Sequence, residues 1–313
     1  MDHLQQHVDA LCTNAVSAAP SVATASDQTR KDALESAAHA IEAASAEIIA
    51  ANAKDMANAD GFNLSDSMRD RLRLDEARIA AVVADLRGVI AQVDPVGRVL
   101  EEREINDGIQ LQKISVPIGV VAIIFESRPN VTVDAAALCV RSGNACILRG
   151  GKEAVHSNNA FVDAFRAGLR AAGINADCVQ VVQEQDRALI PILLSRDDSI
   201  HVVIPRGGEK LIQAVVDCSK VPVIKHDKGV CSIYVHSEAN LDMAEELILN
   251  AKCQRPGVCN TIENIIIDKA IAQSAVPRLA KALQAAGVEL RGEELCQVLA
   301  EDIVATTVAD WET

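Results

Sequence analysis

The chain has 313 residues, and 30 Lys and Arg against 44 Asp and Glu give it a formal net charge of −14. Its length suggests about two domains, and 49% hydrophobic with 24% charged residues is typical of a globular protein rather than a disordered one. The acidic balance argues against nucleic-acid binding, which relies on clustered Lys and Arg. Only six side chains are aromatic, so the core must be built from Ala, Val, Ile and Leu.

Export and membrane insertion are not expected either. The longest apolar run is far shorter than the ~20 residues of a membrane-spanning helix, and the first basic residue is Arg30, so the start of a secretory signal is missing. The nine cysteines are scattered, and none forms a Cys-x-x-Cys pair. The sequence therefore predicts reduced thiols, most of them buried, in a cytoplasmic protein.

The first ninety residues are predicted to be helical. Apolar residues recur at helical spacing over residues 33–51, with Asp27 as the expected cap, and again over residues 72–90. Strand-like spacing follows over residues 98–116, where Asn106-Asp107-Gly108 predicts the turn of a hairpin. Because this hairpin carries many charges, we expect it to project from the body.

After Pro117, short apolar runs alternate with amphipathic helical segments. Continuous apolar strands that alternate with helices are typical of a mostly parallel sheet covered on both faces. The expected strands are residues 120–125, 145–148, 178–182, 201–204 and 221–224. The expected helices lie around residues 133–140, 154–172, 188–194 and 209–216.

A second, shorter α/β series begins at residues 231–235. We expect it to continue with a helix near 241–251, a strand at 261–267 and a helix near 270–286. Because this series stops while it is developing, we expect the chain to be truncated at its C-terminus.

Several common functional motifs are absent from the sequence. It contains neither the Gly-x-Gly-x-x-Gly fingerprint of dinucleotide-binding proteins nor the Gly-x4-Gly-Lys-Ser/Thr loop of NTPases. The seven histidines are dispersed without the spacing of metal ligands, so no metal site is predicted.

Two predicted strand-to-helix turns contain paired glycines and basic residues. Gly207 and Gly208 follow one strand, and Arg149 and Lys152 flank a second glycine pair after another strand. Glycines at a helix start let an anion approach backbone N–H groups, and nucleotides bind at the carboxyl ends of parallel strands. Phosphate binding at these turns is one hypothesis, and the alternative is that they only start helices.

Cys259 is a candidate nucleophile. It lies on a turn between a predicted helix and a predicted strand, shortly after the helix-breaking Pro256. The nearby Arg255 favours the thiolate, which is the nucleophilic form. The alternative is a buried structural cysteine.

A polar segment, residues 126–130, ends the predicted strand at 120–125. Loops at the carboxyl ends of such strands hold ligands, so Arg128 and Asn130 are candidate substrate contacts. A plain connecting loop is the alternative.

These segments together resemble the γ-glutamyl phosphate reductase (glutamate-5-semialdehyde dehydrogenase) family of the aldehyde dehydrogenase superfamily. The resemblance covers essentially the whole chain. It rests on Val-Pro-Ile-Gly-Val at 116–120, Phe-Glu-Ser-Arg-Pro-Asn-Val-Thr at 125–132, Leu-Arg-Gly-Gly-Lys-Glu at 148–153, Pro-Arg-Gly-Gly at 205–208 and Gln-Arg-Pro-Gly-Val-Cys-Asn at 254–260. It implies an α/β fold with N-terminal helices, the hairpin and a Rossmann-like NADP-binding domain in residues 1–228. Residues 229–313 would then be the first part of the catalytic domain.

The resemblance implies NADPH-dependent reduction of L-glutamyl 5-phosphate to L-glutamate 5-semialdehyde, with release of phosphate, in proline biosynthesis. Cys259 matches the nucleophile that forms a thioester, and Asn130 matches the asparagine that helps to hold the oxyanion. The family's hydrolytic relatives carry a general-base glutamate, but the corresponding stretch here, residues 223–229, has none. Its absence leaves the thioester for reduction rather than hydrolysis.

The resemblance also implies sites for the cofactor and the substrate. Gly207 and Gly208 match the turn that faces NADP, Arg149 and Lys152 lie where the adenosine ribose and its 2′-phosphate would be held, and Arg128 or Arg255 would steady the substrate's phosphate. The full-length protein is expected to form a homo-oligomer, and association with glutamate 5-kinase is suggested. Two alternatives stay open: another acylating aldehyde dehydrogenase, such as one that uses a coenzyme A thioester, and a catalytically inactive nucleotide-binding fragment.

Overall fold

The computed structural model describes residues 2–62, 64–126, 128–226, 229–256, 258 and 260–311, without the side chain of Ser67. The chain forms two compact units, Met1–His226 and Asp227–Thr313. The roles predicted for the two parts of the chain, cofactor binding and catalysis, stay predictions.

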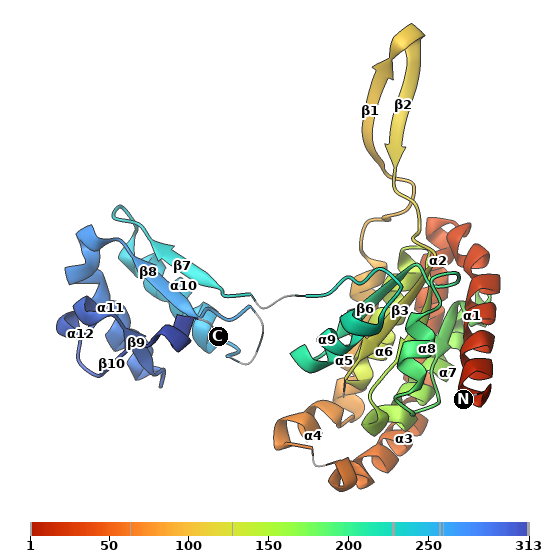
Figure 1. Cartoon of the computed structure of the whole chain (residues 1–313), viewed down its shortest axis with the longest axis horizontal. Helices are drawn as coiled ribbons and strands as arrows, with labels where there is room; N and C mark the ends of the chain where they lie inside the picture. The colour runs from red at the N-terminus through yellow and green to blue at the C-terminus, as the bar shows by residue number, and fades with distance from the viewer. Residues whose placement is uncertain are drawn as a thin grey trace. The chain divides into compact units, whose positions relative to one another are not determined.

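A four-stranded parallel sheet forms the centre of the first unit (Figure 1). Every residue of β3 and β4 is buried, which explains why these strands read as continuous apolar runs. The predicted parallel sheet is therefore confirmed. The strands lie in the order β5 (Val179–Val181), β4 (Ala145–Arg149), β3 (Val120–Phe125) and β6 (Val202–Arg206).

The prediction of a strand at residues 221–224 is wrong. This segment makes only an isolated bridge, between Val203 and Val223. Pro222 accepts a hydrogen bond from Val203 N through its carbonyl oxygen (2.9 Å), but it has no N–H of its own to extend the pairing.

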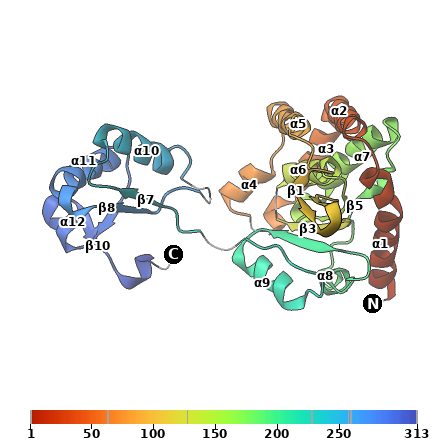
Figure 2. The ribbon, with the colours of Figure 1, turned by 90° about the horizontal axis from the view of Figure 1, so that it is seen from above.

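Helices cover both faces of this sheet (Figure 2). On one face, α6 and α7 contact the strands, and α2, α3 and α5 pack behind them. On the other face, α8 and α9 follow the last two strands, and α1 contacts β3, β4, β5 and α8. The helices of this unit are α1 (Asp2–Ala23), α2 (Asp27–Ala43), α3 (Ser45–Ala57), α4 (Asp66–Leu72), α5 (Glu76–Ile90), α6 (Pro129–Arg141), α7 (Val155–Ala171), α8 (Leu189–Leu194) and α9 (Glu209–Cys218).

The N-terminal helices differ from the prediction in two details. The single helix expected over residues 33–51 is two helices, α2 and α3, which meet at Ala44. The cap of α2 is Ser26, whose Oγ accepts a hydrogen bond from Thr29 N (3.0 Å). Asp27 lies in the first turn instead, where its carboxylate bonds to Lys31 Nζ (2.7 Å).

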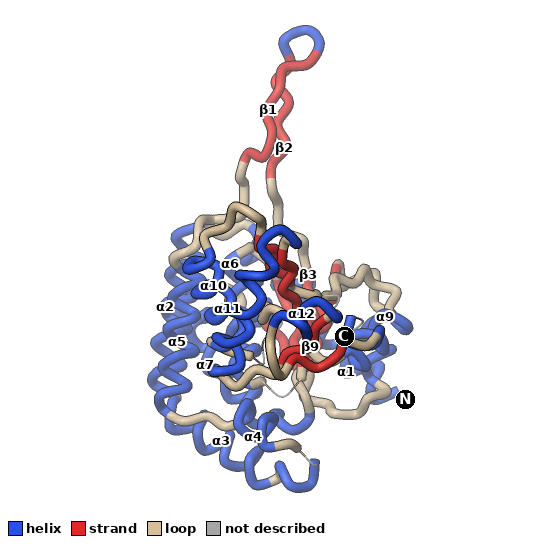
Figure 3. Tube along the Cα trace, turned by 90° about the vertical axis from the view of Figure 1, so that its left-hand side faces the viewer, coloured by secondary structure: helices blue, strands red, loops and turns tan. Residues whose placement is uncertain are grey.

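The predicted hairpin is present as β1 (Val99–Ile105) and β2 (Ile109–Ile114), which pair in antiparallel fashion. Asp107 and Gly108 take the positive φ angles, 64° and 77°, that the tight turn requires. Every residue of both strands is exposed. Figures 1 and 3 show the hairpin extending away from the helices of its unit, as expected.

The second unit is smaller. Its parallel strands β7 (Ser232–Val235) and β8 (Asn264–Ile267) pack against α10 (Leu241–Cys253) and α11 (Ala272–Ala285), as the sequence predicts. A further parallel pair, β9 (Leu290–Gly292) and β10 (Ile303–Ala305), is joined by α12 (Glu294–Leu299) and was not predicted. These three short elements lack a long apolar run or a repeated helical spacing, so the sequence does not mark them.

The eight cysteines that the structure describes are all free, and four of them are buried. Among these eight, the buried cysteines are therefore not a majority, as the sequence had predicted, but half. Across the described part of the chain, none of the helices is both long enough and apolar enough to cross a membrane.

Candidate active site

The strand order of the first unit reverses between β3 and β6. The chain runs from β3 outward to β4 and β5, and then crosses to the other side of β3 to form β6. In open α/β sheets, ligands bind at the carboxyl ends of the strands where the order reverses. The segments that leave β3 and β6 at this point carry Arg128, Asn130, Gly207 and Gly208.

Glu126, the first residue after β3, joins these two segments. Its backbone N–H donates to the carbonyl oxygen of Arg206 (3.3 Å), and its Oε2 accepts a hydrogen bond from Gly208 N (3.1 Å). A Cβ atom at Gly207 would lie 2.6 Å from Cδ of Glu126, so a larger residue there would require this carboxylate to shift. Sequence reasoning missed Glu126, because its partners lie about 80 residues further along the chain.

Asn130 lies in the first turn of α6. Pro129 starts this helix with a φ angle that suits it, and Arg128 precedes it as an exposed residue. The Nδ2 atom of Asn130 donates to Oδ2 of Asp134 one turn later (3.1 Å), which fixes the orientation of the half-buried amide. Burial and then repulsion from Asp85 raise the pKa of Asp134 to about 6. One N–H of this amide is donated to Asp134, and the second N–H, whose direction is fixed by that bond, is suited to stabilising an oxyanion.

Arg149 ends β4, the strand next to β3. Only 8% of it is exposed, and its Nε has no hydrogen-bond partner. Burial, followed by repulsion from Arg187, holds the pKa of the Arg149 guanidinium below its usual range, although Glu153 opposes this shift. A buried cation with an unsatisfied donor and a second cation nearby is costly by itself and favours an anionic ligand.

Lys152, three residues after Arg149, is exposed. Its Nζ lies 4.9 Å from the centre of the Phe62 ring, a cation–π contact that positions the ammonium group near the carboxyl end of β4. Arg149 ends β4 and Lys152 follows it, so both lie at the carboxyl-end edge of the sheet, where the segments after β3 and β6 also begin.

The predicted nucleophile, Cys259, lies outside the described residues. The segment around it is held by Thr261, whose Oγ1 donates to the carbonyl oxygen of Arg255 (2.8 Å) and whose N–H donates to that of Val258 (3.2 Å). Arg255 itself is exposed. These contacts belong to the described residues Arg255, Val258 and Thr261 alone.

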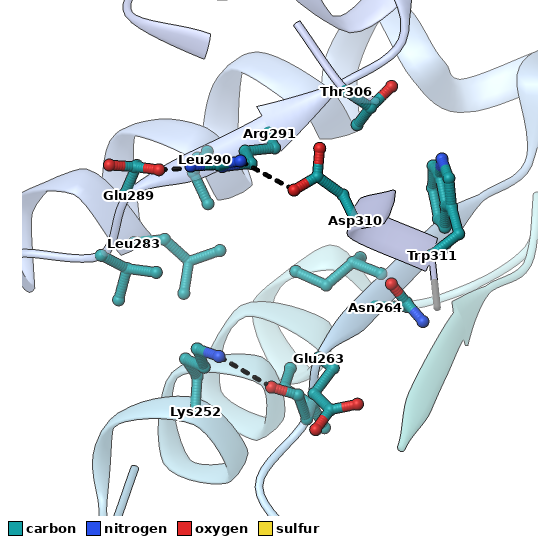
Figure 4. A pocket seen from close by; sticks show the side chains of 13 residues that line it. Lys252, Glu263, Asn264, Leu283, Glu289, Leu290, Arg291, Thr306, Asp310 and Trp311 are labelled. Carbon is teal, nitrogen blue, oxygen red and sulfur yellow. Dashed lines mark hydrogen bonds and ion pairs between the residues drawn. The ribbon is translucent and has the colours of Figure 1, made fainter. Parts of the chain in front are cut away.

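The second unit contains a pocket of about 370 Å³ beside β8 and β9 (Figure 4). Its basic side chains already have partners: Lys252 Nζ donates to the carbonyl oxygen of Ile262 (3.0 Å), and Arg291 pairs with Glu289 (2.9 Å) and Asp310 (2.7 Å). None of the residues predicted for the site lines this pocket. Within the described ranges, there is also no cluster of side chains that could hold a metal ion.

Comparison with known proteins identifies the family of the chain. The model of the aldehyde dehydrogenase family matches residues 2–298. The γ-glutamyl phosphate reductase of Nautilia profundicola is 44% identical over 292 residues, which are 93% of this chain and 71% of that protein. That of Rhodopirellula baltica is 49% identical over 278 residues, which are 89% of this chain and 64% of that protein.

The crystal structure of γ-glutamyl phosphate reductase from Thermotoga maritima is similar over 98% of this chain and 74% of its own, with a TM-score of 0.92 and 35% identity. The chain thus spans about two thirds to three quarters of the length of these relatives. The aldehyde dehydrogenase fold expected from the sequence is confirmed. The chain belongs to the aldehyde dehydrogenase family and, within it, to the γ-glutamyl phosphate reductases.

Proposed function

We propose that this chain carries the cofactor site and the nucleophile of an NADPH-dependent enzyme that reduces L-glutamyl 5-phosphate to L-glutamate 5-semialdehyde and releases phosphate. The names of its relatives support this reductive role in proline biosynthesis. The observation that carries the proposal is the meeting of the segments after β3 and β6 at the reversal of the strand order, because this brings Asn130 to the same edge as Gly207 and Gly208.

The residues at this edge fit NADPH. Arg149 is a buried cation without a partner at its Nε, and Lys152 and Arg187 add positive charge beside the same strand end. We assign Arg149 and Lys152 to the adenosine ribose and its 2′-phosphate, and we assign Gly207 and Gly208 to the turn that the dinucleotide approaches. When bound, NADPH supplies the hydride.

The protein's own chemistry centres on Cys259. Its thiolate attacks the acyl carbon of glutamyl phosphate, the C–O bond to phosphate breaks, and the glutamyl group remains on sulfur as a thioester. The Nδ2–H of Asn130 and the N–H of Cys259 hold the oxyanion during this attack and during the later reduction. Because residues 223–229 contain no glutamate to activate water, the thioester is spared from hydrolysis.

Arg128 and Arg255 are assigned to the phosphate of the substrate. Both are exposed, one before α6 and the other after α10, so neither is committed to a buried structural contact. An arginine presents paired N–H donors that match the oxygens of a phosphate.

The hairpin supports the expected self-association. Its strands expose several large apolar side chains, among them Leu100 (56%), Ile109 (57%) and Ile114 (51%), which is unusual for a surface without a partner. Association with glutamate 5-kinase stays a prediction. The cytoplasmic location also stays a prediction, although the free cysteines fit a reducing compartment.

The proposal is tested in the oxidative direction. The chain, extended to the length of its relatives, is given glutamate semialdehyde, NADP and phosphate, and formation of NADPH is followed. We expect activity that requires phosphate and is abolished by Cys259→Ala, because no other group then accepts the acyl chain. Cys253→Ala is the matched control, since this exposed thiol at the end of α10 is only six residues away and should be dispensable.

Three outcomes separate the alternatives. Activity that survives Cys259→Ala refutes the assigned nucleophile. Activity that requires coenzyme A in place of phosphate identifies a different acylating aldehyde dehydrogenase. Cofactor binding without acylation of the thiol identifies an inactive nucleotide-binding protein.

A further inference from the structure

The carboxylate of Glu126 occupies the amino-terminal end of α9. Its Oε2 lies 3.1 Å from the amide nitrogen of Gly208, the residue that caps this helix. The carboxyl group also lies against the turn at Gly207, where a Cβ atom would approach Cδ of Glu126 to 2.6 Å. The contact therefore depends on two features: the Glu126 side chain is long enough to reach Gly208 N, and Gly207 has no side chain in the space that the carboxylate occupies.

The helix needs an acceptor at this end. Gly208 has the extended backbone of a capping residue (φ −68°, ψ 163°) but no side chain with which to cap the helix. Unsatisfied N–H groups and the helix dipole favour negative charge there. In a capping box, a glutamate within the helix reaches back to the N–H of the capping residue, and here Glu126 does so from the segment that follows β3.

The same position is the one that our proposed function gives to the cofactor. A phosphate at the start of α9 needs the N–H that Glu126 already holds, and two anions so close together repel each other. A second feature points to an anionic ligand along this edge, because the nine-tenths buried Arg149 ends the strand next to β3 with its Nε unpartnered. Glu126 is exposed, so its side chain can leave the helix without disturbing the core.

We propose that Glu126 is an internal anion that competes with the pyrophosphate of NADPH for the N–H of Gly208. In the free protein it satisfies the end of α9, and when the dinucleotide binds, it is displaced into solvent. Its charge thereby lowers the affinity for the cofactor and speeds the release of NADP, the oxidised cofactor, after the reaction. This inference rests on the proposed cofactor site but names a residue that weakens the binding rather than one that supports it.

Equilibrium binding of NADPH to the whole chain, followed by cofactor fluorescence, tests the proposal. Glu126→Gln keeps an acceptor for Gly208 but removes the charge, so we expect the dissociation constant to fall about fivefold to tenfold. Glu209→Gln is the matched control, because it removes one negative charge from the first turn of the same helix without touching the Gly208 contact. We expect it to change the dissociation constant less than twofold.

An unchanged or higher dissociation constant for Glu126→Gln overturns the inference, and a higher value would identify Glu126 as a direct contact of the cofactor. If the dissociation constant of Glu126→Gln for NADPH does not fall, while wild-type activity still requires Cys259, the proposed function stands without the inference. If the variant binds NADPH more tightly but activity survives Cys259→Ala, the inference stands and the proposed chemistry fails. If neither protein binds NADPH, both the cofactor assignment and the inference are wrong.

Discussion

Replacing Arg149 by methionine should have opposite effects on stability and on cofactor binding. The side chain is 8% exposed, its Nε lacks a partner, and Arg187 repels its charge. In the free protein this arrangement is unfavourable, because a buried donor is left unsatisfied near a like charge. Methionine keeps the apolar stem and the approximate volume but removes both penalties.

The magnitudes follow from these contacts. Removing one unsatisfied buried polar group is worth about 1–3 kcal/mol, and we take about 1 kcal/mol, since Glu153 already compensates part of the charge of Arg149. For a unit of this size, that corresponds to an increase in Tm of about 2–4 °C. A charged hydrogen bond to the 2′-phosphate is worth about 1.5–3 kcal/mol, so the affinity for NADPH should fall about 10-fold to 100-fold.

The assay combines thermal unfolding without ligand and fluorescence titration with NADPH and NADH. We expect Arg149→Met to raise Tm, to weaken NADPH binding and to leave NADH binding within about twofold, because NADH has no 2′-phosphate. Arg170→Met, at the exposed end of α7, is the control for the change in net charge and should leave both affinities unchanged. Equal loss of NADPH and NADH binding, or a lower Tm, would refute the reasoning.

Two further predictions concern stability, and both are measured by urea unfolding. The pKa of Asp134, raised to about 6, lies above its unfolded value, so stability falls as pH rises from about 4 to about 6. Asp134→Asn should therefore raise the free energy of unfolding by about 1–2 kcal/mol at pH 7.5 and change it little at pH 4. An equal gain at both pH values would contradict this cause. Gly168→Ala should cost about 1–3 kcal/mol, because its Cβ would lie 2.3 Å from the backbone of Ala37 on α2. The same change at the exposed Gly88 of α5 meets no atom within 4 Å and should stabilise by about 0.5–1 kcal/mol, so matching signs would refute the packing argument.

The sequence predicted best what depends on neighbouring residues. The apolar run at 120–125 became β3 with the same limits, and Asn106-Asp107-Gly108 became the turn of the hairpin. It predicted less well where no local signal marks a change. Residues 33–51 are rich in alanine and lack a helix breaker at Ala44, so the sequence gives no signal for the junction of α2 and α3.

The candidate site shows the same limit. The motifs after β3, β4 and β6 could be read one by one, but the contact of Glu126 with Gly208 depends on the strand order, which places residues about 80 apart side by side. Likewise, Arg149 could be recognised as a cation, whereas its burial and the lack of a partner for its Nε depend on what packs around the end of β4.

The central claim, acyl transfer through Cys259, is tested most directly by mass spectrometry of the intact protein and its peptides. The chain, extended to the length of its relatives, is incubated with glutamate semialdehyde and NADP in the absence of phosphate, so that the thioester accumulates. We predict one glutamyl group per chain, located on Cys259, absent without NADP and released when phosphate is added. A chain that stays unmodified while it turns over substrate, or a glutamyl group found on another cysteine such as Cys253, would contradict the account.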